Sequence, residues 1–532
     1  MRISSVLWSS LVLLAGCVKQ EVATPKLGEP QAANAHADTP GITWFDGDVE
    51  AALAAAQDLH RPVLLYWGAV WCPPCQQLKS TVFSRTDFIE KTKLFVPVYI
   101  DGDAPGAQQI GERFRVSGYP TMVVLDASGN ELQRIAGGMD LAQYANLLDT
   151  VLNDVQPVNA ILDAAVAGRD LTEQQCRRLA YNGWLLDDVD EREYGAQAER
   201  LTQAAQHCPT SAAAERMRLK LFAANYAADA EAEALGAGKA PSAALAARVD
   251  EIAGTLSDRK LAQSTGDALL YLSDNVFKAM KARGAKAAES FAADYSASMD
   301  AIAADANFAA ADQLEALAQK LTATKILSRD DKLPEDLVRS AQARLDAMLA
   351  GDQIPYVRSG IVNSALHAYE ALDDSESAYR TVKGELTKTK TPYYYKADLA
   401  SLAEDLGRKD EAVDWYAQAY NEAEGVATRF QWGTNYLSSL VRLQPNDAAR
   451  IRAVGIQVLG ELDGPDRIYR RSRTRLERLN RELRAWNESA KGAHEDVIGA
   501  LRERMQQTCG KIPAADPSRQ TCDSFLAHGR TT

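Results

Sequence analysis

The sequence predicts an α/β domain with a central mixed sheet and helices on both faces, followed by a large all-helical region. Between residues 42 and 155, apolar runs of strand length alternate with amphipathic helical segments, and the last two runs are joined by a turn. After residue 155 this alternation stops, and alanine and leucine recur at spacings of three and four residues. A chain of 532 residues is also too long for one hydrophobic core, so we expect several domains.

Each element of the α/β part follows from a local pattern. A short edge element at 42–45 precedes an alanine-rich helix at 49–59. A continuous apolar run at 62–67 predicts a buried strand, and it leads into a helix at 76–83 with its apolar residues on one face. The remaining strands are predicted at 94–100, 121–125 and 131–135, and the remaining helices at 108–114 and 141–152.

Two cysteines, Cys72 and Cys75, lie at the junction between the strand at 62–67 and the helix at 76–83. Thiols separated by two residues can interconvert between dithiol and disulfide. The N–H groups of the first helical turn stabilise negative charge, so they favour the thiolate of the first cysteine. The same spacing occurs in zinc sites, but the sequence contains no second C-x-x-C and no histidine cluster to complete one. We therefore predict redox chemistry without a metal or other cofactor.

Two motifs carry a resemblance to a known family. W-C-P-P-C at 71–75 matches a W-C-x-x-C signature, and G-Y-P-T at 118–121 matches a G-x-P-T segment. In this order, between these elements, they resemble the thioredoxin superfamily, and within it the thioredoxin-like domain of exported disulfide reductases such as DsbD. The resemblance implies Cys72 as the nucleophile and Cys75 as the resolving thiol. It also implies a cis Pro120 against the sulfurs, a Tyr119 carbonyl that receives the substrate backbone, and a Trp71 that shields one side.

The sequence departs from the family at two positions. Relatives keep a buried acid six residues before the first cysteine, and here that residue is Tyr66. DsbD-like relatives keep an acid seven residues after that cysteine, and here it is Lys79. We therefore expect slower exchange. The intervening Pro73 and Pro74 offer neither a cation nor a polar side chain to the thiolate, which favours a reductase over a strong oxidant.

The first residues predict export. Residues 1–16 read as a signal peptide with an apolar core too short to span a bilayer. L-A-G-C at 14–17 resembles the lipobox of bacterial lipoproteins and implies lipidation of Cys17, which would anchor the chain without a membrane-spanning helix. The alternative is an ordinary signal with an incidental cysteine. Residues 17–41 read as a flexible tether. The predicted location is the bacterial cell envelope, facing the periplasm, with inner or outer membrane left open.

Four further cysteines form two pairs that are close in sequence. Cys176 could pair with Cys208, and Cys509 with Cys522, as structural disulfides in an oxidising compartment. The alternative is four buried free thiols.

The helical part is predicted in two segments. Residues 156–360 show no defensible period, whereas in 361–532 the pattern at 372–379 recurs at 406–413, an offset of 34 residues. This is the tetratricopeptide period, and a generic helical bundle is the alternative. The arginine-rich stretch at 467–484 is interpreted as a solvated helix face, with an acidic-partner surface as the alternative.

Two hypotheses follow for the function. The first is a thiol-disulfide oxidoreductase that acts on disulfides of exported proteins, with the helical region binding clients or a redox partner. The second is a non-catalytic lipoprotein adaptor in which the helical repeats bind partners and the α/β domain (42–155) is structural. The formal charge of −13 argues against nucleic acid as a partner of either.

Overall fold

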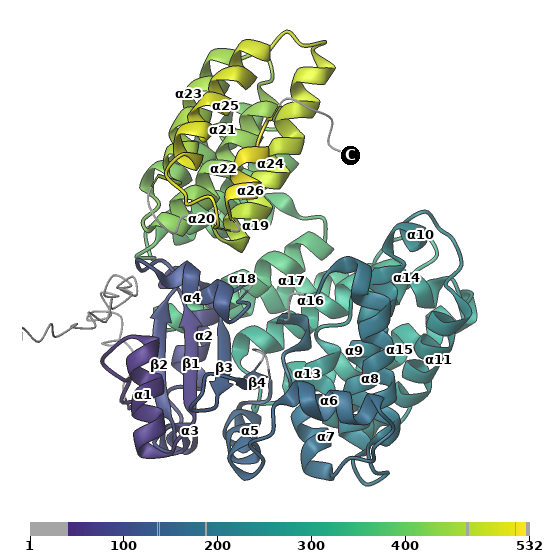
Figure 1. Cartoon of the computed structure of the whole chain (residues 1–532). Coiled ribbons are helices and arrows are strands. Elements are labelled where there is room, and N and C mark those ends of the chain that lie inside the picture. The colour runs from purple at the N-terminus through teal and green to yellow at the C-terminus, as the bar shows by residue number, and fades with distance from the viewer. Residues whose placement is uncertain are drawn as a thin grey trace, which may run out of the picture.

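The computed structural model describes residues 41–116, 118–135, 137, 139–186, 189–463, 468–516 and 518–527. The predicted signal peptide, the lipid site Cys17 and all but the last residue of the predicted tether lie outside these residues. Figure 1 shows an α/β domain beside which the helices form an arch, first along one side of the domain and then over its end.

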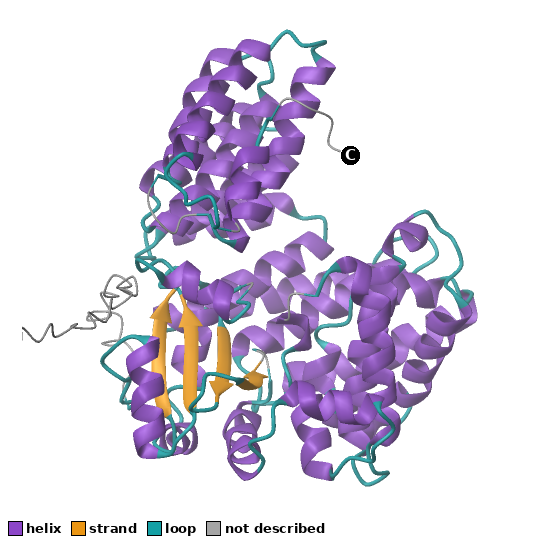
Figure 2. Cartoon of the chain, in the orientation of Figure 1, coloured by secondary structure: helices purple, strands orange, loops and turns teal. Residues whose placement is uncertain are grey.

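The sheet has four strands in the order β2-β1-β3-β4, coloured orange in Figure 2. The strands are β1 (Val63–Gly68), β2 (Val96–Asp101), β3 (Thr121–Leu125) and β4 (Glu131–Ile135). β1 runs parallel to β2 and antiparallel to β3, and β4 is antiparallel to β3. This confirms the predicted mixed sheet.

Helices cover both faces of the sheet, as predicted. α1 (Val49–Leu59) and α4 (Ala107–Arg113) pack against the face that carries Val63, Leu65 and Trp67. The opposite face packs against α2 (Pro73–Thr81), α3 (Thr86–Thr92) and α5 (Leu141–Asn153). β1 is therefore buried along its whole length, which explains its uninterrupted apolar sequence.

The edge element expected at 42–45 is not a strand. This segment lacks regular structure, but it lies at the sheet edge: the Phe45 N–H donates to the Pro97 carbonyl at 2.7 Å, and the Trp44 ring lies 6.0 Å from the Tyr66 ring and 5.9 Å from the Tyr99 ring. The other edge of the sheet, at β4, is covered by the residues that follow α7 (Glu173–Ala180). There Ile135 forms a β-bridge with Asn182, and the Gln133 side chain donates to the Arg178 carbonyl. Pairing of this kind protects an exposed strand edge.

All regular elements after α5 are helical, in agreement with the sequence. They are α6 (Val158–Val166), α7 (Glu173–Ala180), the short η2 (Trp184–Leu186) and η3 (Glu191–Glu193), α8 (Tyr194–His207), α9 (Ala213–Ala230), α10 (Ala232–Gly236), α11 (Ala243–Leu256), α12 (Arg259–Ser264), α13 (Gly266–Leu269), α14 (Asp274–Lys281), α15 (Ala285–Ala304), α16 (Ala310–Leu327), α17 (Glu335–Ala350), α18 (Pro355–Ala371), α19 (Ser375–Glu385), α20 (Pro392–Asp405), α21 (Lys409–Glu422), α22 (Val426–Leu443), α23 (Ala448–Gly460), α24 (Arg470–Ser489), α25 (Glu495–Cys509) and α26 (Ser518–Ser524).

The helical arch meets the α/β domain at three places, and at one of them α18 packs on α2. On the side of α5, one continuous cluster of buried apolar residues extends from the sheet through α6–α9 to α16. At the other end, α20–α26 share a second cluster with Trp71 and the two cysteines. We call α20–α26 the cap; in Figure 1 it is the green-to-yellow part above the domain.

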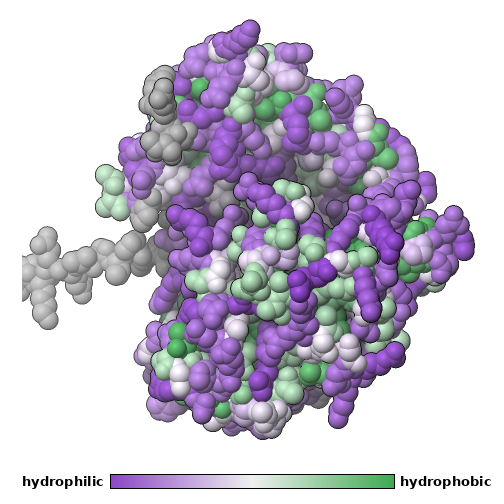
Figure 3. Space-filling view, turned by 90° about the vertical axis from the view of Figure 1, so that its right-hand side faces the viewer, coloured by the Kyte–Doolittle hydropathy of each residue, from purple (hydrophilic) through white to green (hydrophobic). Residues whose placement is uncertain are grey.

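The segment with the 34-residue offset forms successive helix pairs. The turn before α19 contains Asp373 at φ 56°, and the turn before α21 contains Gly407 at φ 73°, so the two left-handed residues also lie 34 positions apart. The tetratricopeptide-like assignment itself stays a prediction. Among the residues that the structure describes, none of the helices combines the length and apolarity of a bilayer span. The face in Figure 3 is mainly hydrophilic, with strongly hydrophobic residues scattered across it.

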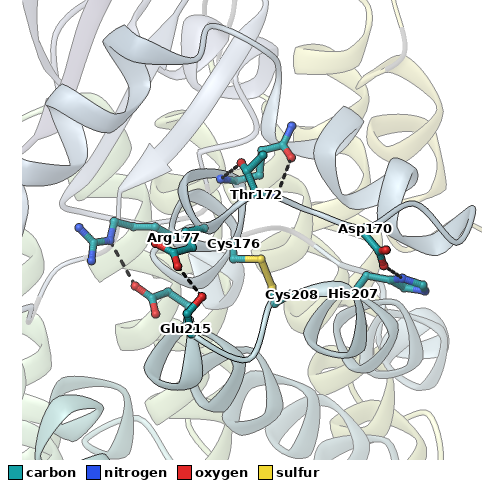
Figure 4. The surroundings of a disulfide bond; sticks show 10 residues. Asp170, Thr172, Cys176, Arg177, His207, Cys208 and Glu215 are labelled. Carbon is teal, nitrogen blue, oxygen red and sulfur yellow. Dashed lines mark hydrogen bonds and ion pairs between the residues drawn. A yellow bond between two sulfur atoms is a disulfide. The ribbon is translucent and has the colours of Figure 1, made fainter.

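Two disulfides lie in the helical region. Cys176 on α7 is bonded to Cys208 at the end of α8, 32 residues away, and Cys509 is bonded to Cys522, 13 residues away. Polar contacts surround the first bond in Figure 4: Arg177 pairs with Glu215 at 3.2 Å, and His207 lies 3.2 Å from Asp170. These are the two pairs that lie close together in the sequence.

Candidate active site

The cysteine pair begins α2. Cys72 is the N-cap residue, and its sulfur accepts the Cys75 N–H at 3.2 Å. Pro73 and Pro74 occupy the first two helical positions, where they provide no N–H donor. The two cysteines form a disulfide with a Cα–Cα distance of 5.2 Å. In the reduced state, the Cys75 N–H and the positive end of the helix would stabilise a thiolate at Cys72.

The peptide bond between Tyr119 and Pro120 is cis and immediately precedes β3. The Tyr119 ring lies 5.8 Å from the Trp71 ring in an edge-on arrangement, so this loop lies against the cysteine segment. The Tyr119 hydroxyl accepts a hydrogen bond from Gln108 at 2.7 Å, and burial raises the pKa of this phenol.

Tyr66 and Lys79, at the two positions where the resemblance led us to expect an acid, are buried. The Tyr66 hydroxyl has no hydrogen-bond partner among the described residues, and burial raises its pKa, so it stays protonated. The Lys79 side chain is 7 % exposed, and its Nζ lies 5.2 Å from the centre of the Tyr99 ring. The Asp101 carboxyl interacts electrostatically with Tyr66 and Tyr99. Burial raises the pKa of Asp101, and the charge of Lys79 acts in the opposite direction. The sequence analysis missed Asp101.

Comparison with known proteins identifies the α/β domain. The family model of the thioredoxin-like domain matches residues 49–152. This segment is a thioredoxin-like domain.

Curated relatives match part of the chain. The thiol:disulfide interchange protein DsbD of Cronobacter sakazakii is 32 % identical over 126 residues, which are 23 % of this chain and 21 % of that protein. DsbD of Haemophilus influenzae is 28 % identical over 101 residues, 18 % of this chain and 17 % of that protein. The chain therefore spans about a fifth of the length of these curated relatives. A solution structure of a thioredoxin from Thermus thermophilus is 30 % identical, covering 21 % of this chain and 88 % of that one, with a TM-score of 0.20.

The cap covers the cysteines of the thioredoxin-like domain. Cys75 is fully buried and Cys72 is 3 % exposed. Trp71 is stacked on Tyr394 of α20, with ring centres 5.8 Å apart, and meets Trp432 of α22 edge-on at 6.4 Å. Trp71 therefore contacts the cap in this structure, in place of solvent or a client.

Polar contacts also join the cap to the thioredoxin-like domain near Trp71. The Asp103 carboxylate accepts hydrogen bonds from the Trp71 indole at 2.7 Å, and from the backbone N–H and hydroxyl of Thr428 at 3.1 and 2.8 Å. Arg473 pairs with Glu112 at 2.5 Å, and the Arg471 guanidinium lies 4.6 Å from the centre of the Tyr119 ring. The interpretation of the arginine-rich stretch as a solvated face is wrong for these two arginines, which contact the thioredoxin-like domain.

Two polar contacts join α2 to the middle of the arch. The Gln77 amide donates to Asp312 of α16 at 3.0 Å, and the Ser359 hydroxyl of α18 donates to Gln76 at 2.9 Å. Burial raises the pKa of Asp312 to about 6. These partners are separated by hundreds of residues, so no local pattern could have revealed them. In the described part of the chain, no group of three His, Cys, Asp or Glu residues is arranged to hold a metal ion.

Proposed function

We propose that this chain is a thiol-disulfide oxidoreductase that acts as a reductase through Cys72 and Cys75. The observation that carries the proposal is a pair of bonded cysteines at the start of a helix, beside a cis proline, in a thioredoxin-like domain. The names of the DsbD relatives, thiol:disulfide interchange proteins, support the same reaction class.

The proposed reaction transfers two electrons to a client, meaning a protein whose disulfide is exchanged. The Cys72 thiolate attacks one sulfur of the client disulfide, forming a mixed disulfide and releasing the other client sulfur as a thiolate. The Cys75 thiolate then attacks the Cys72 sulfur, which releases the second client thiolate and leaves the Cys72–Cys75 disulfide. The released thiolates take up protons from water. A dithiol partner must then reduce the pair for the next turnover.

The prolines favour the reductase direction. Because Pro73 and Pro74 lack N–H groups, the helix offers the Cys72 sulfur the N–H of Cys75 at its third position. Strong oxidants of this family have a stabilised thiolate form, and fewer donors stabilise that form less.

The buried state of Cys72 requires the cap to separate from the thioredoxin-like domain before a client can bind. On the cap side, Tyr394 and Trp432 pack on Trp71. The polar contacts of the cap come from Thr428, Arg471 and Arg473. Domains of one chain commonly move relative to one another unless the interface is large and hydrophobic. In the open state, the Tyr119 carbonyl and Pro120 would receive the client backbone, and Trp71 would flank it.

We further propose that the chain is an envelope lipoprotein anchored through Cys17 and facing the periplasm. Its clients would be exported proteins with disulfides, and the helical region would bind those clients or a redox partner. The L-A-G-C segment and the two disulfides of the helical region support an oxidising compartment.

The burial of Cys72 also favours a second candidate, a non-catalytic adaptor with a permanently closed disulfide. Insulin reduction by the wild-type chain and by Cys72→Ser separates the two. The first proposal predicts loss of reduction in Cys72→Ser and a trapped mixed disulfide in Cys75→Ser. Equal rates of insulin reduction in wild type and Cys72→Ser would reject the oxidoreductase proposal and favour the adaptor.

A further inference from the structure

A cavity of about 600 Å³ lies directly beside the cysteine segment. One wall belongs to the thioredoxin-like domain and includes Pro74 of α2 and the cis Pro120. The opposite wall belongs to the arch and is formed by η2, α9, α16, α18 and the residues around α13. Cavities that bind ligands in proteins have volumes of roughly 300–1,000 Å³, so this one is large enough for side chains of a bound peptide. We call it the side cavity.

Apolar side chains form most of the lining of the side cavity. Those of the arch include Trp184, Leu185, Phe222, Leu270 and Tyr271. The charged side chains of the lining are already bonded to partners in the same lining, Arg218 to Asp267, His367 to Glu315 at 2.8 Å and Asp312 to Gln77 at 3.0 Å. A ligand would therefore meet mainly apolar surface.

Two of the arch residues in this lining are large apolar side chains that stay exposed in the folded chain. Leu185 of η2 and Tyr271, which follows α13, are each 42 % exposed. Single apolar residues scattered over a surface are ordinary, whereas exposed apolar residues gathered at one place indicate a binding surface. Here two separate parts of the chain bring such residues to one cavity, beside Pro120.

The walls of the side cavity are joined without the cap. The Tyr271 hydroxyl donates to the Gly137 carbonyl at 3.0 Å, which ties the arch to the loop between β4 and α5. α18 packs closely on α2, since a Cβ atom at Gly360 would lie 3.2 Å from the Gln77 Oε1. The cavity therefore keeps its shape when the cap opens, and a preformed site lowers the entropic cost of binding.

We propose that the side cavity binds an apolar segment of the client, whose large aliphatic or aromatic side chains pack on Leu185 and Tyr271. The inference rests on the proposed function, because the occupant is the polypeptide whose disulfide is exchanged. Pro74 is close to Cys72 in α2 and Pro120 is the proposed contact of the client backbone, so a client bound at Cys72 continues along this wall. Folded proteins bury most of their large apolar side chains. The arch would therefore select exported proteins that are incompletely folded and expose apolar residues near a disulfide.

The test measures binding without any thiol chemistry. The full chain carrying Cys72→Ser and Cys75→Ser is titrated into two fluorescein-labelled peptides of one sequence, which have two phenylalanines in one peptide and two serines in the other. We expect the phenylalanine peptide to bind at least about tenfold more tightly, the ratio that corresponds to about 1.4 kcal/mol. Added sodium chloride should not reduce this preference, because it depends on apolar burial and not on charge.

Variants locate the site. Leu185→Glu places a charge on an exposed position of the cavity wall and should weaken binding of the phenylalanine peptide about three- to tenfold. Leu185→Met keeps an apolar side chain and should retain the preference. Leu94→Glu is the matched control, because Leu94 is 46 % exposed and precedes β2, at the end of the sheet opposite to Cys72. It should change neither peptide.

Three outcomes overturn the inference. The first is equal binding of the two peptides, which needs no variant and so does not depend on how a variant folds. The second is an effect of Leu94→Glu as large as that of Leu185→Glu. The third is a wild-type dimer in analytical ultracentrifugation that Leu185→Glu dissociates, since a second copy would then occupy the cavity.

These outcomes are separable from failure of the proposed function. Each leaves the oxidoreductase proposal standing if insulin reduction depends on Cys72. Conversely, a phenylalanine preference that Leu185→Glu removes, in a chain that does not reduce insulin, would retain the side cavity as a peptide site and reject the redox function.

Discussion

Replacing Thr428 by valine should expose Cys72 by weakening the cap contact. The Thr428 hydroxyl donates to the Asp103 carboxylate at 2.8 Å, and valine removes this donor while keeping nearly the same shape. Thr428 lies on the cap and Asp103 on the thioredoxin-like domain, so this hydrogen bond exists only in the closed state. The variant therefore shifts the equilibrium between the closed and the open state of the cap towards the open state.

The magnitude follows from the charge of the acceptor. A hydrogen bond to a charged group contributes roughly 1.5–3 kcal/mol, and 1.4 kcal/mol corresponds to a factor of ten in an equilibrium constant. Asp103 keeps the hydrogen bonds from the Trp71 indole and the Thr428 backbone, and it is only partly buried. We therefore expect the lower end of this range, an opening constant about tenfold larger.

The assay is alkylation of the single thiol left at the site in Cys75→Ala. When opening is fast relative to labelling, the rate at which a maleimide modifies Cys72 is the opening constant multiplied by the rate for an exposed thiol. Mass spectrometry of the peptide that contains residue 72 separates this thiol from the other cysteines. Thr428→Val should raise the rate about tenfold.

Thr434→Val is the matched control. Its hydroxyl lies on the same helix but donates to the Gln431 carbonyl within that helix at 2.8 Å, so the cap contact is unchanged. A Cys72 labelling rate in Thr428→Val equal to the wild-type rate would refute the reasoning. So would an equal acceleration in Thr434→Val.

Three further predictions concern stability and proton chemistry. Removing the Cys176–Cys208 bond by double alanine substitution should lower the free energy of unfolding by about 4 kcal/mol, against about 3 kcal/mol for Cys509–Cys522, because the first closes the longer loop; urea unfolding checks the order. Tyr66→Phe removes a buried hydroxyl without a partner, so urea unfolding should show unchanged or slightly greater stability, and insulin reduction should be unchanged; a slower rate would assign Tyr66 to proton transfer. Asp312→Asn should raise the melting temperature above about pH 6, because the folded state raises the pKa of Asp312 from 3.8 to about 6 and buries its charged form. This advantage should shrink as the pH falls from about 6 towards 3.8, where the folded carboxyl is protonated, and melting curves over that range test the sign.

The α/β domain could be predicted because its strands and helices are determined by patterns among residues that are close together in the sequence. The strand at 121–125 and the helix at 49–59 agree with β3 and α1 to the residue, since turn residues and caps bound them. The placement of Cys72 at a helix N-terminus followed from its position directly after a buried strand. The segment at 42–45 lies at the sheet edge as expected but forms no strand, because it is held by one backbone hydrogen bond and by ring contacts of Trp44 in place of regular pairing.

The cap could not be predicted, because its contacts join distant parts of the chain. Trp71 meets Tyr394 and Trp432, and nothing in the W-C-x-x-C motif distinguishes a tryptophan that faces solvent from one stacked under a helix. The arginines of α24 have the spacing of a solvated face, and only the approach of Glu112 and Tyr119 shows that Arg473 and Arg471 are interface residues. Periodicity identifies which face of a helix is polar, but it cannot identify what that face meets.

Two of the contacts between the arch and the thioredoxin-like domain, the one on the side of α5 and the one at the cap, differ in chemistry, and this difference determines which of them opens more readily. On the side of α5, apolar residues of the sheet, α5 and α6 form one buried cluster, so separation there would expose a continuous core. At the cap, the apolar contacts of Trp71 and the two cysteines are combined with hydrogen bonds to Asp103 and an ion pair that is partly solvated. Hydrogen bonds and exposed ion pairs are readily replaced by water, whereas apolar core contacts are not. Opening should therefore occur at the cap while the contact on the side of α5 stays closed, which exposes Cys72.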